Sequence, residues 1–252
     1  VMVMAPSDHW IEDEEAFSKD IALAFESVRS QDRIITLGIK PSFPNTGYGY
    51  IKYDPTEALQ VKPVETFTEK PSYAVAKEFL KSGNYVWNAG IFVWNVAFII
   101  KSFTTNLSEM FQLFSKEESV LNTSEERKFV KDNYSAAEDI SIDYGILEKE
   151  KGTVYVILAR FDWNDLGTWG SLYTESLKDE QENVVLNVRL HAENSKRNII
   201  TSDKNKLVVV EDLCDHIIVD ENEILLIVPK EKEQEIKAIR EKVQKKFGHN
   251  LG

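Results

Sequence analysis

The ten residues from Tyr85 to Trp94 restrict most strongly what this chain can fold into. They read Tyr-Val-Trp-Asn-Ala-Gly-Ile-Phe-Val-Trp, and Asn88 is the one strongly polar side chain among them. Such an apolar run after a turn is typical of a buried strand. A buried amide without a hydrogen-bond partner costs about 1–3 kcal/mol. Asn88 therefore either bonds to nearby backbone or belongs to a pocket wall and directs its amide at a hydroxylated ligand; the stretch alone leaves both interpretations open.

Strand and helix patterns alternate along the first two thirds of the chain. The apolar run Val1–Ala5 is expected to be a core strand, and a helix is expected after it from the apolar positions Phe17, Ile21, Ala24, Phe25 and Val28. Further strands are expected at Arg33–Ile39, Tyr50–Tyr53, Val61–Thr68 and Thr153–Ala159. Further helices are expected at Tyr73–Ser82, Val96–Thr104, within the polar stretch Leu107–Asn133, and from Asp139 to Lys149. This order predicts an α/β fold, with a mostly parallel Rossmann-like sheet flanked by helices.

The character of the sequence changes after Lys178. Short β-rich pieces follow at Val184–Leu190, Asn198–Thr201, Leu207–Val210, His216–Val219 and Ile224–Val228. They indicate a small β domain made of hairpins or a few β-helix turns, with a terminal helix over Lys230–Phe247 and no full repeat period. We therefore expect two domains, residues 1–178 and 179–252.

Composition excludes several classes of function. The chain has 252 residues and a net charge of −12, which disfavours nucleic-acid binding because phosphate backbones require clustered Lys and Arg. The single cysteine, Cys214, lies in an acidic stretch and is interpreted as structural. Neither a signal peptide nor an apolar run of the roughly 18–20 residues that span a membrane is visible. These features favour a cytoplasmic protein without membrane partners.

Two aspartates stand where a strand pattern gives way to a helix pattern. Asp8 follows the first strand, and Asp165 follows Thr153–Ala159. Each is interpreted either as a helix N-cap or as a ligand at the carboxyl end of a strand. Two such corners could share a divalent cation such as Mg²⁺, which binds carboxylate, phosphate and water oxygens.

Two further segments suit a sugar phosphate. Gly47, Tyr48, Gly49 and Tyr50 alternate in a loop, which is either simple turn chemistry or a place where backbone and aromatic faces approach a sugar ring. The pair Glu69-Lys70 is either a solvated strand end or a carboxylate for sugar hydroxyls beside an ammonium for a phosphate. Four of the five tryptophans lie around Asn88 and Asp165, which suggests two faces of one site or core.

Taken in order, these motifs resemble the mannose-1-phosphate guanylyltransferases of the sugar nucleotidyltransferase superfamily. The matching segments are Pro6-Ser7-Asp8-His9, Thr46-Gly47-Tyr48-Gly49-Tyr50-Ile51, Phe67-Thr68-Glu69-Lys70-Pro71, Trp87-Asn88-Ala89-Gly90-Ile91-Phe92, Ser141-Ile142-Asp143-Tyr144 and Trp163-Asn164-Asp165-Leu166-Gly167-Thr168-Trp169. Each is weak alone, but their order is specific. The resemblance covers nearly the whole chain, more loosely after Lys178.

The resemblance implies a role for each matching residue. Asp8 and Asp165 would be the Mg²⁺ ligands, and Glu69 and Asn88 would hold the mannose hydroxyls. Lys70 would lie near the sugar phosphate. The loop of Gly47, Tyr48, Gly49 and Tyr50 would line the sugar site, with Gly49 lending its backbone. The implied reaction joins mannose-1-phosphate to GTP and releases pyrophosphate, without a covalent enzyme intermediate.

The chain departs from the family pattern at one place. The family's glycine-rich loop, Gly-Gly-x-Gly-x-Arg, which wraps the triphosphate, has no counterpart in this sequence. We therefore expect the chain to be the sugar-binding half and tail of a longer enzyme, and to bind GTP poorly by itself. Another sugar-1-phosphate nucleotidyltransferase and a non-catalytic regulatory relative remain alternatives. The resemblance also implies a homodimer, formed with the help of the β-rich tail.

Overall fold

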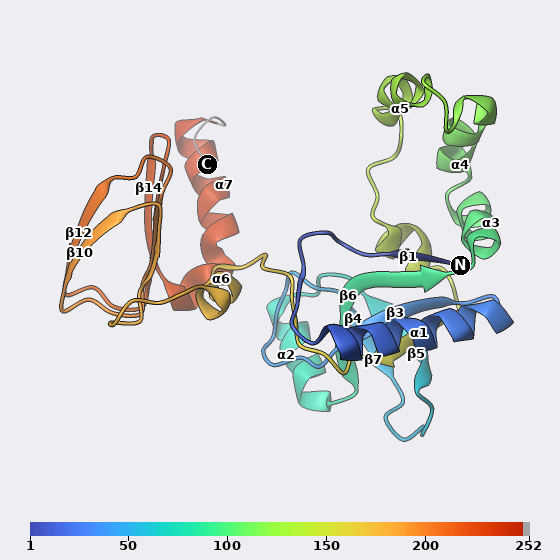
Figure 1. Cartoon of the computed structure of the whole chain (residues 1–252), viewed down its shortest axis with the longest axis horizontal. Coiled ribbons are helices and arrows are strands. Elements are labelled where there is room, and N and C mark those ends of the chain that lie inside the picture. Colours follow the sequence, from blue (N-terminus) through green and yellow to red (C-terminus); the bar gives the residue numbers. More distant parts are fainter. Residues whose placement is uncertain (249–252) are drawn as a thin grey trace. The chain divides into compact units, whose positions relative to one another are not determined.

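The computed structural model describes residues 1–248, which form two compact units (Figure 1). The first unit contains Val1–Ser7 and Ile11–Trp163, and the second contains Asp8–Trp10 and the chain from Asn164 onward. The predicted domain boundary at residues 178/179 stays a prediction, and residues 249–252 of that domain lie outside the described range.

A six-stranded sheet forms the centre of the first unit. Its strands are β1 (Met2–Met4), β3 (Ile34–Ile39), β4 (Tyr50–Tyr53), β5 (Val61–Thr68), β6 (Tyr85–Trp94) and β7 (Val154–Leu158). Their order is β1-β6-β3-β7-β5-β4, and a further pairing of β6 with β4 closes a ring of five strands. The short strands β2 (Trp10–Ile11) and β8 (Trp163–Asn164) form a separate two-stranded sheet.

The expectation of a mostly parallel sheet is wrong. Of the pairings described in this sheet, β3–β7 is parallel, whereas β1–β6, β3–β6, β4–β5, β4–β6 and β5–β7 are antiparallel. The alternation of strands and helices was the basis of the expectation. Such alternation does not determine strand direction, because the direction depends on which strands pair. Here β6 pairs antiparallel with β3 and β4, which lie far from it in the sequence.

The first strand is also not a core strand. β1 pairs with β6 at the edge of the sheet, and Val1, Met2, Val3 and Met4 are 38–48% exposed. Within residues 1–248, β6 is its one pairing partner. An apolar run predicts a strand, but its burial depends on what covers it.

Local sequence signals explain where α1 (Glu14–Ser30) begins and where α2 (Tyr73–Ser82) ends. α1 starts after Asp13, whose carboxylate accepts from the Ala16 N–H at 2.9 Å. Its apolar side packs on β3, β6 and β7 (Figure 1). α2 ends at Gly83, which has a left-handed φ of 74° that glycine adopts without steric cost.

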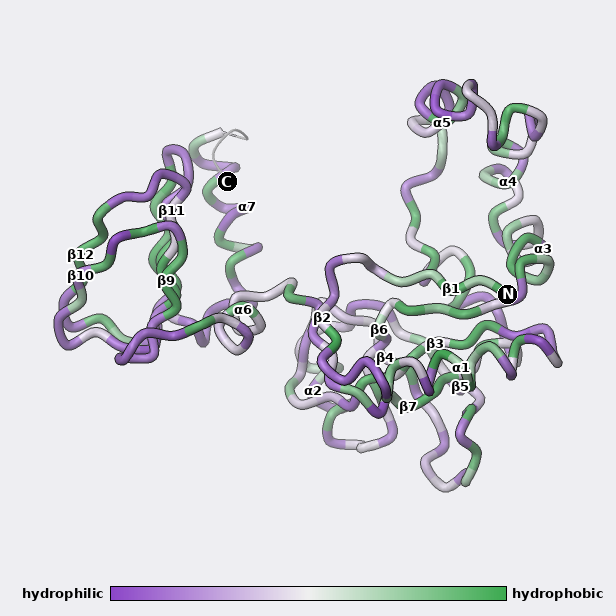
Figure 2. Tube along the Cα trace, viewed as in Figure 1, coloured by the Kyte–Doolittle hydropathy of each residue, from purple (hydrophilic) through white to green (hydrophobic). Residues whose placement is uncertain are grey.

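The chain between β6 and β7 is helical. Its segments are α3 (Val96–Asn106), α4 (Ser108–Ser115), the 3₁₀ turn η1 (Glu118–Val120), α5 (Glu126–Tyr134) and the π-helical turn η2 (Asp143–Leu147). It packs on the other face of the sheet through α3, α4 and η2. Phe98 and Ile99 of α3 and Ile146 of η2 join the core there. Figure 2 shows α5 as mostly hydrophilic, which fits the solvated helix expected in this polar stretch.

The second unit is a short stack of parallel β coils with two helices. Its strands are β9 (Val184–Leu186), β10 (Arg189–Glu193), β11 (Ile199–Ser202), β12 (Leu207–Glu211), β13 (His216–Glu221) and β14 (Ile224–Pro229). Its two α-helices are α6 (Trp169–Glu175) and α7 (Ile236–Phe247), and the 3₁₀ segment η3 (Lys230–Glu235) precedes α7. β9–β11, β11–β13 and β10–β12 are parallel, as expected for β-helix turns, whereas β13 and β14 pair antiparallel as a hairpin. Both of the expected arrangements are therefore present.

The coils have a period that sequence analysis did not find. Register partners lie eighteen residues apart in β10–β12 and β11–β13, as in Arg189–Leu207 and Ile199–Ile217, and fifteen residues apart in β9–β11, where Val184 pairs with Ile199. Left-handed residues mark the corners in pairs at the eighteen-residue spacing: Asn187 and Asn205, Asn194 and Asp212, Arg197 and Asp215. Asn and Asp tolerate this conformation better than most residues do, so the period is carried by corner residues.

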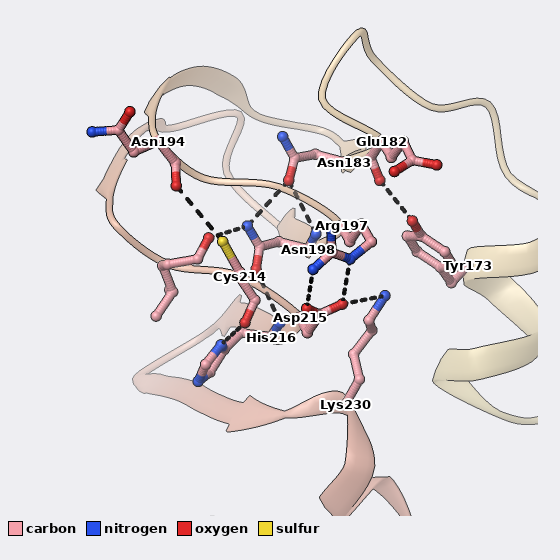
Figure 3. A network of polar contacts seen from close by, with 11 residues as sticks. Tyr173, Glu182, Asn183, Asn194, Arg197, Asn198, Cys214, Asp215, His216 and Lys230 are labelled. Carbon is pink, nitrogen blue, oxygen red and sulfur yellow. Dashed lines mark hydrogen bonds and ion pairs between the residues drawn. The ribbon is translucent and has the colours of Figure 1, made fainter.

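Buried amides tie the coils together (Figure 3). The Asn198 side-chain NH₂ donates to the Asn183 side-chain oxygen and to the Leu213 carbonyl, while its own oxygen accepts from the His216 N–H. Asn183 and Asn198 are fully buried. Each coil thus satisfies polar groups of the next, as buried polar atoms require.

Within residues 1–248, no helix has both the length and the apolar character that crossing a membrane requires.

Candidate active site

The Glu69-Lys70 corner follows β5 and has a strained backbone. Lys70 has a φ of 43°, and its N–H donates to the Tyr48 carbonyl at 3.2 Å. A left-handed residue with a side chain costs roughly 1–2 kcal/mol, and such strain is concentrated at functional sites. The Glu69 side chain is 7% exposed and the Lys70 side chain 60%, with their charged atoms 3.4 Å apart. A buried carboxylate thus lies beside an exposed ammonium.

Gly49 makes room for this carboxylate. A Cβ at position 49 would lie 2.5 Å from Glu69 Oε2 and 3.0 Å from the Phe67 ring. The Gly49 carbonyl accepts from the Asn88 backbone N–H at 2.8 Å, which links the loop to β6. A side chain at position 49 would therefore displace the Glu69 carboxylate.

The Asn88 amide is held at both of its ends. Its oxygen accepts from the Thr36 hydroxyl at 2.7 Å and from the Gly90 N–H at 3.2 Å. Its nitrogen donates to Asp143 Oδ1 at 3.1 Å. The interpretation that Asn88 bonds to nearby backbone thus holds for Gly90, and two side chains complete its environment. Because an amide NH₂ has two hydrogens, one N–H stays available beyond these contacts.

Asp143 is the residue of this cluster that sequence analysis did not select. It begins η2, and burial is the main cause that raises its pKa above the usual carboxyl value. Burial also raises the pKa of Glu69, with the negative charges of Asp143 and Glu148 adding to the effect and Lys70 opposing it. The signal that could have identified Asp143 is its place in the segment Ser141–Tyr144, one of the matching motifs.

Tyr48 brings together two of the predicted aromatic residues. Its ring centroid lies 5.1 Å from that of Trp87 and 5.4 Å from that of Trp163. The other two tryptophans are elsewhere: Trp94 is 1% exposed in the sheet core, and Trp169 packs in the second unit. The four tryptophans therefore do not form one site.

Gly47 and Tyr50 shape the loop that carries Tyr48 and Gly49. The Gly47 N–H donates to Asn45 Oδ1 at 2.7 Å, and the Tyr50 hydroxyl donates to the Asn45 carbonyl at 2.9 Å. Tyr50 is fully buried. Its side chain therefore holds the loop from the core side through the Asn45 carbonyl. Gly47 is exposed at the loop surface.

Asp8 and Asp165, both in the second unit, are not helix caps. Asp13 caps α1, and the Thr168 hydroxyl caps α6 by accepting from the Ser171 N–H at 3.1 Å. Asp165 Oδ1 accepts from the Gly167 N–H at 3.1 Å. The capping interpretation is therefore wrong for both aspartates.

Both carboxylates act on the same side chain, His9. Burial lowers the pKa of His9, and the charges of Asp165 and Asp8 act against this by raising it. Within residues 1–248, no group of three or more His, Cys, Asp or Glu side chains could hold a metal ion. A pair of carboxylates suits a hard cation that takes its other oxygens from phosphate and water.

The predicted residues thus form two groups, one in each unit. Gly47, Tyr48, Gly49, Glu69, Lys70 and Asn88 lie together in the first, with Tyr50 beneath them. Asp8 and Asp165 lie in the second. A cavity of about 530 Å³ beside α4 is lined by other residues, among them Leu107, Met110 and Lys149.

Comparison with known proteins gives the class to which this architecture belongs. The sequence model of the nucleotidyl transferase family matches residues 1–182. The chain therefore belongs to the nucleotidyl transferase family, as the order of its motifs predicted.

Individual relatives are more specific. The chain is 30% identical over 244 residues to the alginate biosynthesis protein AlgA of Pseudomonas aeruginosa, which covers 95% of this chain and 50% of that protein. It is 30% identical over 242 residues to a mannose-1-phosphate guanylyltransferase of Salmonella muenchen, with coverage of 95% and 50%. The chain thus spans about half the length of these relatives.

A solved structure shares the fold along almost the whole chain. It is the crystal structure named as a mannose-1-phosphate geranyltransferase from Thermus thermophilus, 31% identical, with a TM-score of 0.75. The match covers 96% of this chain and 69% of that one. The predicted α/β nucleotidyltransferase fold with a β-rich C-terminal domain is confirmed.

Proposed function

We propose that this chain is part of an enzyme that transfers a guanylyl group from GTP to mannose-1-phosphate. The proposal rests on the family of the chain and on the names of its relatives. One structural observation supports it most: the Glu69 carboxylate lies against Gly49 with Lys70 beside it, and Asn88 contacts the same loop.

These groups suit the two ends of a sugar phosphate. An ionised carboxylate accepts hydrogen bonds from hydroxyl groups, and Lys70 is an exposed point charge for the phosphate. The half-buried Tyr48 ring is an apolar surface for the sugar ring, and the buried Trp87 packs against it. We assign Glu69 and Asn88 to the mannose hydroxyls, Lys70 to the phosphate, and the loop of Gly47, Tyr48, Gly49 and Tyr50 to shaping the sugar site.

Asp8 and Asp165 are assigned to a bound Mg²⁺. Their oxygens suit such a cation, and two carboxylates leave coordination positions for phosphate oxygens. When bound, the cation would neutralise charge on the phosphates during transfer. Asp165 keeps its own carboxylate oriented by accepting from the Gly167 N–H.

The reaction needs no covalent enzyme intermediate. A phosphate oxygen of mannose-1-phosphate attacks the α-phosphorus of GTP, a new P–O bond forms, and the bond to pyrophosphate breaks. The residues of this chain contribute by positioning the sugar phosphate and by offsetting charge. The enzyme is proposed to be cytoplasmic and to act as a homodimer.

Pyrophosphate release by the full-length gene product tests the assignment. We expect release with GTP, mannose-1-phosphate and Mg²⁺, and much slower release with UTP or dTTP. Asp165→Asn should reduce the rate by at least about 100-fold, as expected when a group that holds a catalytic cation loses its charge.

Thr168→Ala is the matched control, because it removes a helix cap three residues away. It should cost about 1 kcal/mol of stability and leave most of the activity. Failure of mannose-1-phosphate to react with GTP would overturn the proposed function. Full activity of Asp165→Asn would remove the assignment of that residue.

A further inference from the structure

The contacts of Asn88 fix which end of its amide is the oxygen. The Gly90 N–H can only donate, so the amide atom facing it is the oxygen. An ionised Asp143 carboxylate can only accept, so the amide atom facing it is the nitrogen. Thr36, which is fully buried, adds a second partner for the oxygen. Asp143 therefore determines, together with Gly90, that Asn88 presents an N–H and no free carbonyl oxygen.

Asp143 has acceptor capacity that its contacts do not use. A carboxylate has about four lone-pair positions. Asn88 takes one of them on Oδ1, and hydrogen bonds with the Ser141 side chain and the Asp143 backbone lower the pKa of the group without cancelling the effect of burial. Among residues 1–248, no Lys, Arg or His nitrogen lies within 4.0 Å of this carboxylate. A half-buried charge without a close cation is costly for the folded chain.

Glu69 adds a second carboxylate to the same place. Its side chain is 7% exposed, and the charge of Asp143 contributes to raising its pKa. Lys70 compensates part of this charge, but its ammonium is 60% exposed. Two carboxylates so close together do not stabilise the folded chain by themselves. They would stabilise the binding of a ligand with several hydroxyl groups, because each carboxylate accepts a charge-assisted hydrogen bond.

We propose that Asp143 is a sugar-binding and specificity-determining residue, whose carboxylate accepts from a hydroxyl of the sugar-1-phosphate other than the one bound by Glu69. This inference rests on the proposed function of the same site. Asp143 has two tasks in this scheme. It holds the Asn88 amide in one orientation, and it reads one hydroxyl group directly.

Substitution by the isosteric amide separates the two tasks. In Asp143→Asn the new side chain can still turn its oxygen to the Asn88 nitrogen, so the orientation of Asn88 is retained. The charged acceptor for the hydroxyl is lost. Asp143→Ala removes both. Asp139→Asn, an exposed aspartate four residues earlier, is the charge-matched control.

The experiment measures binding of mannose-1-phosphate to this chain by calorimetry. We expect Asp143→Asn to weaken binding by about 10- to 100-fold, the range for losing a hydrogen bond to a charged group. Asp143→Ala should weaken it at least as much, and Asp139→Asn should leave it unchanged. Thermal unfolding of each variant verifies that it is folded.

Analogues that lack one hydroxyl each then identify the contact. For one of the 2-, 3-, 4- or 6-deoxy sugar phosphates, Asp143→Asn should no longer weaken binding, because that analogue lacks the hydroxyl group that Asp143 contacts. Glu69→Gln should lose its effect with a different analogue. A loss that is equal for every analogue, or no loss at all, would overturn the inference while the proposed function stands. Absence of binding by the unsubstituted chain would overturn the inference, whereas the proposed function is judged by pyrophosphate release from the full-length gene product.

Discussion

The carboxylate of Glu69 occupies the space that a side chain at Gly49 would need, with 2.5 Å between Oε2 and the Cβ position. Gly49→Ala should therefore displace the carboxylate, which is the movable end of a flexible side chain. We expect the protein to fold and the affinity for mannose-1-phosphate to fall by roughly tenfold, the effect of weakening one charged hydrogen bond.

A double-mutant cycle with Glu69→Ala tests this mechanism. If the effect of Gly49→Ala passes through the carboxylate, it should vanish once the carboxylate is removed. Calorimetric affinities of the two single variants and the double variant give the coupling. Additive losses would mean that Gly49 contributes to binding through its backbone alone.

The strained backbone of Lys70 should appear as a difference between two substitutions. Lys70→Gly and Lys70→Ala both remove the ammonium and should weaken binding of the sugar phosphate alike. Lys70→Gly should be more stable than Lys70→Ala by about 1 kcal/mol. Glycine avoids the steric cost of the left-handed backbone at this position, and its greater flexibility in the unfolded chain offsets part of that gain. Urea unfolding compares the two, and equal stability would contradict the role of strain.

Asp143 and Glu69 should make stability depend on pH in an unusual direction. Both have raised pKa values in the folded chain, mainly through burial. The folded state therefore binds protons more readily than the unfolded state, and stability falls as pH rises from about 4 through the raised pKa values. Asp143→Asn should raise the unfolding temperature at pH 7 by roughly a few degrees at most, and the gain should disappear near pH 4.

Asp215 supplies a control of opposite sign. Arg197 lowers the pKa of Asp215 through a direct hydrogen bond. This carboxylate therefore stabilises the folded state above the usual carboxyl pKa, and its contribution is lost as pH falls through the lowered value. Asp215→Asn should destabilise the protein at pH 7 and matter less in acid. Equal behaviour of the two variants would contradict the assigned causes.

The buried amide Asn198 should be essential for the β coils. Replacement by alanine leaves the Leu213 carbonyl and the His216 N–H without their partner. We expect a loss of at least about 2 kcal/mol, since each unpaired buried group costs about 1–3 kcal/mol. Gln181→Ala, at an exposed position nearby, should stay within about 0.5 kcal/mol. Denaturant unfolding of both variants checks the difference.

The sequence predicted those parts of the fold that depend on neighbouring residues. α2 has the predicted bounds because the residues at its ends are local signals, with Gly83 at the C-terminal end. β4 and β5 also match, since alternation and turn residues define them. Strand direction was wrong because β6 pairs with β3 across a long stretch of chain, and no local pattern records that pairing.

The candidate site divides in the same way. Glu69, Lys70 and Gly49 were found because each lies at a strand end or in a glycine-rich loop. Asp143 was missed as a site residue because its partner Asn88 is 55 residues away. The residues next to Asp143 in the sequence indicate only the start of a short helical turn. Contacts between distant residues carry the information that the local pattern lacks.

The eighteen-residue spacing from β10 to β12 and from β11 to β13 limits how this part of the protein can change in length. Removal or insertion of eighteen residues keeps each corner over a corner and each inward side chain inward. A change of one residue within a strand would turn its apolar side chains outward, because successive strand residues face opposite sides. Relatives that differ in the size of this region are therefore expected to differ by whole coils.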